Sequence, residues 1–480
     1  MSRPSYTLGF ESLHFETRDT PLAVQGKLPS WLAGQLLRTG PALFEVGARR
    51  VNHWFDGLAM LHKFSVADGQ VHYANRYLRS DTYCADTAAE RLTRGQFATD
   101  PCQTLFGRVK SFFRAGPPTD NANVNVTIVD ERIVAVTETP MPVIFDPETL
   151  VTEGHVQFAD AVRGMQTPAH PHFEHDGTLY SFLLYFGARS CYRLYRMRPG
   201  SRQREVIAEI PVARPSYVHS FGMTEHYLVL ARFPLVVTPV RLKLAPRPFI
   251  QNFVWQPERA LVFDVVHKHS GERVASMAAE PGFAFHHVNA CERGGRLEVD
   301  IAIFDDAHII DSLYLEKLRH GRPTRGAGRL RRYYLPLTAR AEPWHEDITS
   351  EPFELPRINY RRCNARAYRY AFGVGQTPTG DFVDTLVKVD TRTGAAHRWH
   401  ENGCYPGEPV FVAAPEASGE DSGVVLSVVL DARSERSFLL ALDAQTFTEM
   451  ARAEVPHHIP FGFHGQFFEA GADRHRHLHR

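Results

Sequence analysis

Short runs of apolar, β-branched and aromatic residues recur along the whole chain, separated by residues that are typical of turns. Runs of this kind, about four to eight residues long, predict β-strands. Long stretches with the 3.6-residue period of an amphipathic helix are few. The clearest expected strands are Arg132–Thr137, Thr178–Phe186, His226–Arg232, Ala260–Val266, Leu297–Phe304, Phe382–Val389 and Gly423–Asp431. The pattern therefore predicts an all-β protein.

Pairs that end in glycine lie between many of these runs and predict hairpin turns, because glycine adopts the positive φ that tight turns require. They are Asp56-Gly57, Asp68-Gly69, Asp176-Gly177, Gly294-Gly295 and Thr393-Gly394. No linker rich in Gly, Ser or Pro divides the 480 residues, so we expect one domain over residues 1–480. Many short strands over this length favour a closed radial array of sheets, a β-propeller, over a sandwich.

One segment, Asp100–Gly116, departs from the β pattern and predicts a helix, with Asp100 as its cap, Pro101 at its first position and Gly116 at its end. Its apolar residues share one face: Leu105, Phe106, Val109, Phe112 and Phe113. The helix either packs on the core as an ordinary surface helix or enters a lipid leaflet. In the second case the basic and apolar stretch Phe233–Phe249 would join it.

Composition narrows the class of protein. Hydrophobic residues make up 43% and charged residues 22%, which is ordinary for a soluble domain with a large core. The 54 basic and 54 acidic residues cancel, which argues against a nucleic-acid partner. Six cysteines without CxxC spacing indicate reduced thiols and a cytoplasmic protein.

The sequence predicts neither an N-terminal targeting segment nor a membrane-spanning helix. The N-terminal residues lack the apolar region of a signal peptide. No uncharged apolar stretch approaches the roughly 20 residues that a spanning helix needs. The His-rich tail, about 472–480, is expected to be disordered.

Histidine alone says little in a chain with 25 of them, but four stand at expected strand ends beside Gly, Pro or aromatic residues. They are His170, His219, His286 and His464. A local zinc motif such as HExxH is absent, so a metal site would need separate strands that converge in space, as on the axis of a propeller. Imidazole suits Fe, Zn, Cu and Ni. Each histidine alone is more typical of a core residue with satisfied hydrogen bonds than of a metal ligand.

A ligating imidazole usually has its second N–H held by a carboxylate. Three glutamates lie in apolar, proline-containing surroundings: Glu138 in AVTETP, Glu354 in FELPRIN and Glu408 in PGEPVFV. Each alone fits a surface residue at a strand end. Together with the four histidines they would complete a tetra-imidazole metal site.

The order of several motifs makes the chain resemble the carotenoid cleavage oxygenase family over nearly its whole length. They are HWFDGLAMLHKFSV (53–66), YLRSDTY (77–83), DPCQTLF (100–106), TDNANVNV (119–126), and the stretches around the four histidines, Glu354 and Glu408. The resemblance implies a seven-bladed β-propeller with Fe(II) on its axis and a helical and loop cap over the substrate tunnel. Dioxygen would be the co-substrate.

The resemblance also assigns roles to residues. His170, His219, His286 and His464 match the iron ligands, and the first histidine of FHHVNA is the ligand, which selects His286 over His287. Glu138, Glu354 and Glu408 match the carboxylates that orient His219, His286 and His464 respectively, which leaves His170 without a carboxylate partner.

The implied activity is oxidative cleavage of a conjugated double bond in a carotenoid or apocarotenoid, giving two aldehyde or ketone products. Central 15,15′ cleavage to retinal is one form of it. The stilbene-cleaving branch has a lysine directly before the first glutamate; Thr137 stands there, near the expected metal, and favours the carotenoid branch. A retinoid isomerohydrolase, a stilbene-cleaving oxygenase and a non-catalytic carotenoid-binding propeller remain the alternatives.

The expected partners are a hydrophobic polyene and a membrane surface, which residues 100–116 and 233–249 would contact. We expect no nucleic acid and no protein partner. The protein would then be cytoplasmic with a peripheral contact to the membrane.

Overall fold

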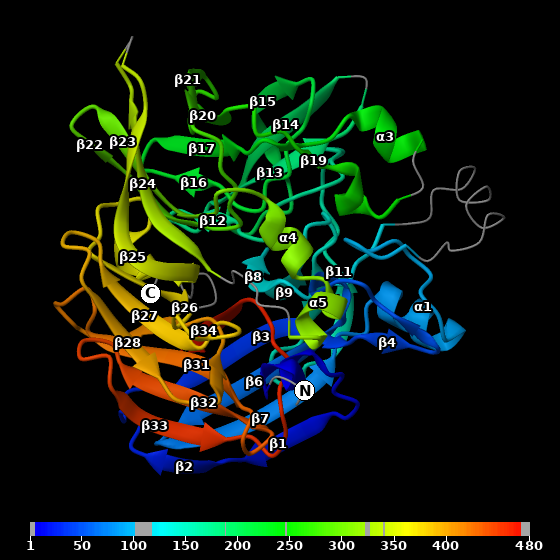
Figure 1. The fold of residues 1–480 in the computed structure, drawn as a ribbon, viewed down its shortest axis with the longest axis vertical. Helices are drawn as coiled ribbons and strands as arrows, with labels where there is room; N and C mark the ends of the chain where they lie inside the picture. The colour runs from blue at the N-terminus through cyan, green and yellow to red at the C-terminus, as the bar shows by residue number, and fades with distance from the viewer. Residues whose placement is uncertain are drawn as a thin grey trace.

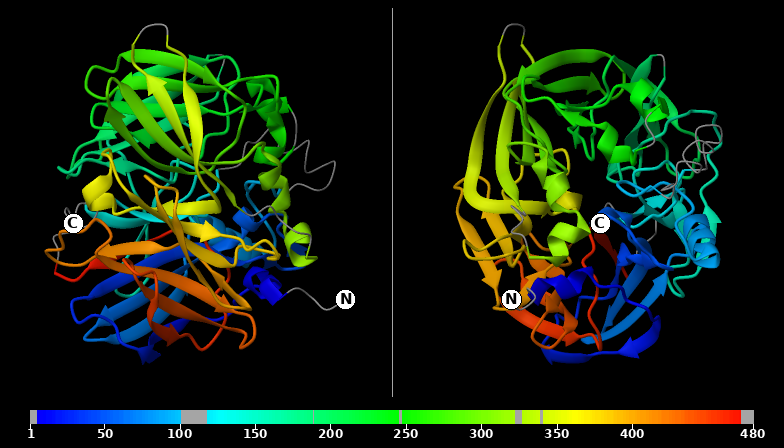
Figure 2. Two further views of the ribbon diagram at one scale, coloured as in Figure 1. Left: turned by 60° about the vertical axis from the view of Figure 1, so that its left-hand side comes forward. Right: turned by 45° about the vertical axis from the view of Figure 1, so that its right-hand side comes forward.

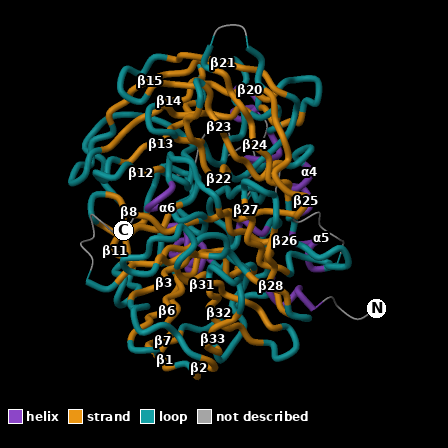
Figure 3. Tube along the Cα trace, turned by 90° about the vertical axis from the view of Figure 1, so that its left-hand side faces the viewer, coloured by secondary structure: helices purple, strands orange, loops and turns teal. Residues whose placement is uncertain are grey.

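A computed structural model describes residues 5–100, 118–187, 189–244, 247–321, 327–338 and 341–471. Its larger sheets are arranged radially around a central axis (Figures 1 and 2). Strands dominate the trace, and helices occur in the connections between them (Figure 3). The sheets form seven blades, which confirms the all-β propeller and the blade number implied by the resemblance.

The first blade joins the two ends of the chain. In spatial order its strands are β1 (Thr17–Pro21), β7 (Gln70–Tyr77), β6 (Leu58–Ala67), β3 (Gly34–Leu43) and β34 (Gly465–Glu469). β34 runs antiparallel to β3 with Arg38 opposite Gly465. β2 (Ala23–Gly26) crosses to the last blade and pairs with β33 (Glu449–Glu454). These two exchanges between the chain ends close the ring.

Three four-stranded blades follow in chain order. The first has β8 (Asn125–Val129), β9 (Arg132–Val136), β10 (Val143–Phe145) and β11 (Thr152–His155). The next has β12 (His172–Phe173), β13 (Leu179–Tyr185), β14 (Ser190–Met197) and β15 (Glu205–Val212). The third has β16 (Gly222–Met223), β17 (Tyr227–Arg232), β20 (Leu261–His267) and β21 (Arg273–Ala279).

The fifth and sixth blades share the long strand β25 (Trp344–Arg357), which pairs first with β24 (Gly328–Pro336) and then with β26 (Tyr370–Gly375). The other strands of these two blades are β22 (His287–Arg293), β23 (Arg296–Ile303), β27 (Thr385–Asp390) and β28 (Ala396–His400). The last blade contains β29 (Cys404–Pro406), β30 (Val410–Ala413), β31 (Gly423–Asp431), β32 (Arg436–Asp443) and β33.

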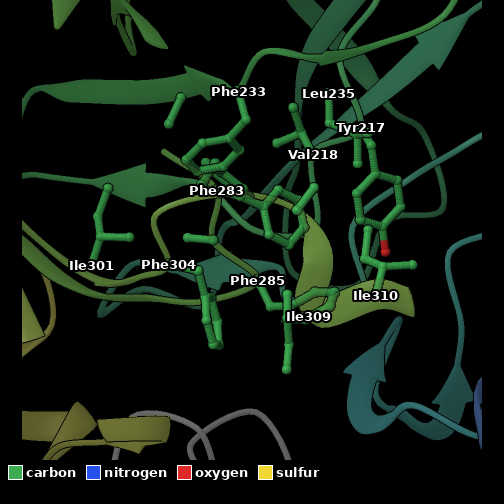
Figure 4. Packing of buried hydrophobic residues seen from close by; sticks show 14 of the residues in the cluster. Tyr217, Val218, Phe233, Leu235, Phe283, Phe285, Ile301, Phe304, Ile309 and Ile310 are labelled. Carbon is green, nitrogen blue, oxygen red and sulfur yellow. The ribbon is translucent and has the colours of Figure 1, made fainter. Parts of the chain in front are cut away.

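Short elements fill the connections. The helices are η1 (Ser5–Phe10), η2 (Trp54–Asp56), α1 (Asp81–Ala89), α3 (Pro239–Leu244), η3 (Phe249–Asn252), α4 (His308–Ser312), α5 (Leu315–Arg319) and α6 (Tyr360–Cys363). The small hairpins are β4 (Glu45–Val46) with β5 (Arg49–Arg50) and β18 (Leu235–Val236) with β19 (Val254–Trp255). Ile309 on α4 belongs to the largest buried cluster, where aromatic side chains from several blades meet (Figure 4). This arrangement agrees with the expected helical and loop cap.

Each expected strand is a strand in the structure, with ends that differ by at most three residues. Four of the five expected turns carry glycine at positive φ. The exception is Asp56-Gly57, where the hairpin prediction is wrong: the pair ends η2, and Gly57 has a φ of −61°. A Cβ on Gly57 would lie 2.7 Å from side-chain atoms of Phe44 and Pro41, so glycine is required here for close packing.

Of the two segments that we expect at a membrane surface, the structure describes most of one and only Asp100 of the other. Residues 101–117 lie outside the described residues, and so does the tail 472–480. In the second segment Phe233, Leu235 and Val237 are buried in the core, so its first part presents no surface. Val240 on α3 is 59% exposed. Within the described ranges, no helix has the length and apolar character to span a bilayer.

Candidate metal centre

Four histidines from four blades meet on the propeller axis. His170, His219, His286 and His464 lie one to three residues before β12, β16, β22 and β34, each an edge strand of its sheet. One nitrogen from each ring lies within 4.8 Å of the others. Since the four edges converge on one point, the blades position the imidazoles as the strand-end pattern predicted.

The facing nitrogens have the spacing of ligands that share one ion. His170 Nε2 lies 3.1 Å from His219 Nε2, and His286 Nε2 lies 3.1 Å from His464 Nε2. Two imidazole nitrogens held at about 2.1 Å from one metal, roughly at right angles, are about 3 Å apart. In the three rings whose Nδ1 donates to a carboxylate, Nε2 carries a lone pair. Lone pairs this close repel each other, and a cation between them removes that repulsion.

Each of the three glutamates holds one histidine. Glu138 Oε1 lies 2.7 Å from His219 Nδ1. Glu354 Oε2 lies 2.6 Å from His286 Nδ1, and Glu408 Oε1 lies 2.6 Å from His464 Nδ1. These are the pairs that the resemblance implies. Such contacts fix the tautomer and the ring orientation of a ligand.

His170 differs from the other three histidines. No carboxylate hydrogen-bonds to it in the part of the chain that the structure describes, and it is partly exposed. This too agrees with the resemblance. Its ring contacts the rings of His219, His286 and His464, with the His464 centroid 4.4 Å away. The centre is therefore asymmetric, with one histidine held only by its packing.

Glu408 is the most strongly paired of the carboxylates. Arg357 donates from Nε to Oε1 at 2.8 Å and from Nη2 to Oε2 at 3.1 Å, and the Gly465 N–H donates to Oε2 at 2.9 Å. Burial alone would raise the pKa of Glu408, but Arg357 and His464 lower it to about 2. Burial lowers the pKa of His464 to about 4, against the opposing effect of Glu408. At neutral pH the carboxylate is charged and the imidazole is neutral, as metal binding requires.

The other two glutamates have weaker additional partners. The Tyr217 hydroxyl donates to Glu138 Oε1 at 2.6 Å, the same oxygen that faces His219. The backbone N–H of Leu355 donates to Glu354 Oε2 at 2.6 Å, whereas Glu354 Oε1 is buried without a hydrogen-bond partner in the described part of the chain. An arginine thus holds Glu408, a tyrosine holds Glu138, and a backbone amide holds Glu354.

Sequence reasoning missed Tyr217 and Arg357. Signals existed for both, since Tyr217 stands two residues before His219 and Arg357 three residues after Glu354 in the same FELPRIN stretch. Thr137, the residue expected near the metal, is half-buried directly after β9 and directly before Glu138. Its role stays a proposal.

Two cavities flank the histidines, and they differ in how polar their walls are. The first is apolar, and its wall includes Phe55, Phe285, Ile309, Leu313 and Phe463 together with His219, His286 and His464. The second has a mixed wall, in which His170, His172, Ser220, Arg357 and Gln466 lie among apolar side chains. Figure 4 shows Phe285 and Phe304 beside Ile309 in the apolar region. A metal at this point would face an apolar ligand from one side and polar groups from the other.

Known proteins are similar to this chain in fold and in sequence over nearly their full length. The sequence profile of the family described as retinal pigment epithelial membrane protein matches residues 10–469. The mitochondrial carotenoid-cleaving dioxygenase of Macaca fascicularis is 35% identical, over 92% of this chain and 91% of its own. The carotenoid isomerooxygenase of Galleria mellonella is 34% identical over 92% of each chain. Cobalt-substituted Synechocystis ACO, an apocarotenoid oxygenase, superposes with a TM-score of 0.87 at 26% identity and covers 97% of this chain and 98% of its own.

Proposed function

The chain belongs to the retinal pigment epithelial membrane protein family, and on that basis we propose that it is a non-haem iron dioxygenase that cleaves a conjugated double bond of a carotenoid or apocarotenoid. One observation carries the proposal: three of the four clustered histidines line an apolar cavity. The names of the similar proteins support the same reaction class.

The residues present fit an Fe(II) ion. His170, His219, His286 and His464 would hold it, and their neutral rings suit a divalent first-row metal. Glu138, Glu354 and Glu408 would orient three of the rings. The bound iron would supply the binding and activation of dioxygen.

The protein itself supplies position and exclusion of water. Phe55, Phe285 and Phe463 present ring surfaces to the apolar cavity, and Ile309 and Leu313 close it from the cap. Such walls bind a polyene through shape and burial. A polyene that lies along them would bring one double bond to the histidine cluster, and that alignment fixes the scissile bond.

The bond that is cut is a finer part of the proposal. If β-carotene is cleaved centrally at the 15,15′ bond, retinal is the single product. Off-centre cleavage gives two products of different length. Chromatography of the products from a panel of carotenoids and apocarotenals distinguishes these outcomes, and Thr137, proposed to lie near the iron, is the residue to vary first.

A peripheral contact with a membrane completes the proposal, because a polyene of this kind partitions into lipid. Val240 on α3 and Val254 on β19 are exposed apolar residues, 59% and 42% accessible. We assign residues 100–116, most of which lie outside the described residues, to the same surface on the basis of their sequence. In a liposome flotation assay, Val240→Asp should reduce the floating fraction; unchanged flotation of a Val240→Asp plus Val254→Asp variant would remove this surface from the proposal.

Adjacent histidines provide the test of the metal site. His286→Ala should abolish iron binding, measured by elemental analysis after reconstitution. His287→Ala should keep it, because His287 Nδ1 lies 2.8 Å from Ser220 Oγ and the ring does not belong to the histidine cluster found among the described residues. Equal iron content in both variants would refute the assignment.

The reaction class is tested with labelled oxygen. Incubation of the iron-loaded protein with β-carotene or an apocarotenal under ¹⁸O₂ should give labelled aldehydes. Ester cleavage with isomerisation and no label would indicate a retinoid isomerohydrolase instead. An iron-free protein that binds the polyene and takes up no oxygen would indicate a carotenoid-binding propeller.

A further inference from the structure

A third, smaller cavity lies behind the metal centre, where the first and last blades meet. Its wall is formed by β3, β6, β31, Gly407 and the segment that precedes His464. Its volume is about 20 Å³. That is room for one water molecule or one monatomic ion. None of the described residues that line it is acidic.

A buried arginine has one unpaired guanidinium nitrogen at this cavity, as far as the described residues show. Arg38 lines the cavity and is only 6% exposed. Among the described residues, Nη1 is buried with no hydrogen-bond partner, and Nη2 makes only a long contact of 3.4 Å with the Phe463 carbonyl. A buried guanidinium whose N–H groups are left unpaired is costly, so a missing acceptor is expected beside it.

Another donor lines the same cavity. His62 is 5% exposed, and its Nδ1 lies 2.8 Å from the hydroxyl of the fully buried Tyr73. When that hydroxyl donates to Nδ1, the ring proton is on Nε2, which then becomes a donor. Burial, with His457 and Arg38 nearby, lowers the pKa of His62 well below its usual value, so the ring is neutral.

The nearest carboxylate does not complete the site. Glu408 follows Gly407 in the cavity wall, but its oxygens already accept from Arg357, Gly465 and His464. A Cβ on Gly407 would lie 3.3 Å from Arg38 Nη1, so the guanidinium lies beside the backbone next to Glu408, and within the described ranges it makes no hydrogen bond to the Glu408 oxygens. The charge of Arg38 thus has no hydrogen-bonded counter-charge among the described residues.

We propose that this cavity binds a single small anion of halide size, chloride under physiological conditions, between Arg38 Nη1 and the ring N–H of His62. The wall offers one cationic donor, one neutral donor and apolar side chains such as Val428 and Leu430. Arg38 lies opposite Gly465 in the β3–β34 pair, so the anion is bound directly behind the strand that follows His464. The anion neutralises Arg38 and braces the junction at which the ring closes.

Bromide provides a direct test that needs no variant and no turnover. In crystals of the intact protein grown in sodium bromide, anomalous scattering should show a bromide peak in this cavity. A difference peak without anomalous signal would identify a water molecule as the occupant and would overturn the proposal.

Thermal unfolding provides the second test. At constant ionic strength, Tm should rise with chloride or bromide in place of gluconate, because an anion that binds only the folded state stabilises it. The rise should be lost in Arg38→Met and retained in Arg50→Met, a control that removes an exposed arginine. If Arg38→Met does not fold, Val428→Leu, which fills the cavity and leaves Arg38 in place, should lose the rise as well. The proposal is contradicted if Tm is the same in gluconate as in chloride or bromide. It is also contradicted if the rise in Tm persists in Val428→Leu.

Discussion

Arg357 binds both carboxylate oxygens of Glu408, at 2.8 and 3.1 Å, while Glu408 holds His464 from the same oxygen that Arg357 Nε contacts. The arginine is partly exposed, with a side-chain accessibility of 22%, and the glutamate is buried at 1%. A solvent-facing cation thus compensates a buried anion directly behind a proposed metal ligand.

Removal of this arginine should destabilise the fold. Arg357→Met leaves Glu408 buried without its counter-charge, and losing one partner of a buried pair typically costs about 3–5 kcal/mol. Urea unfolding of the metal-free protein measures the loss. Adding Glu408→Gln should recover part of it, because the orphaned charge is then absent. Equal stability of Arg357→Met and the parent protein would show that the pair contributes little.

Tyr217 and His219 share Glu138 Oε1, at 2.6 and 2.7 Å. Glu138→Gln should weaken metal binding roughly tenfold to a hundredfold, the usual effect of losing a carboxylate behind a ligating histidine. Tyr217→Phe keeps the ring and removes one donor to the carboxylate, so it should weaken binding less. Competition with a chromophoric chelator measures both affinities. A larger loss of metal affinity in Tyr217→Phe than in Glu138→Gln would contradict the prediction.

Strands and turns were predictable because their signals are local. Gly423–Asp431 is read from the sequence with the bounds that the structure has. Asp56-Gly57 was misread because glycine has two separate uses: it permits positive φ, and it permits close packing. At Gly57 the second use applies, against Phe44 and Pro41, and these partners are distant enough in sequence that no local pattern indicates them.

The histidine cluster depends on long-range convergence. His170 and His464 belong to different blades, and their rings lie 4.4 Å apart although no short motif links them. Context in the sequence separated strand-end histidines from the rest, and the family resemblance selected the four. Arg357 and Tyr217 were missed because their roles depend on which strand ends meet on the axis. That arrangement is a property of the closed ring, and no single blade carries it.

Asp56 should make stability depend on pH. It is buried, and burial raises its pKa to about 7 despite hydrogen bonds from Thr99 and Ala98. The unfolded chain loses this proton near pH 4, whereas the folded protein keeps it until about pH 7. The free energy of unfolding should therefore fall as pH rises from 4 to 7, by about 4 kcal/mol for this group.

Comparison with Asp56→Asn isolates that contribution, because asparagine stays neutral over the same range and still offers an acceptor. Urea unfolding at pH 5 and pH 8 should show a smaller difference in Asp56→Asn than in the parent protein. Asp68→Asn, in an exposed turn where asparagine tolerates the positive φ, is the control and should behave like the parent. The same pH difference in all three proteins would contradict a raised pKa for Asp56.

Variants of two adjacent isoleucines on α4 can distinguish the effect of blocking the apolar cavity from the effect of overpacking the core. Both side chains are buried in the same cluster (Figure 4), but Ile309 lines the cavity and Ile310 does not. Ile309→Trp should fill the space in which a polyene must lie and lower turnover by about a hundredfold, since small misplacements of a substrate have effects of that size. Iron content should stay at the level of the parent, because no residue of the histidine cluster changes.

Ile310→Trp is the control. It carries a similar overpacking cost, about 1–3 kcal/mol, without blocking the cavity, and should keep most of its activity. Equal turnover in the two variants would mean that this cavity is not the path of the substrate.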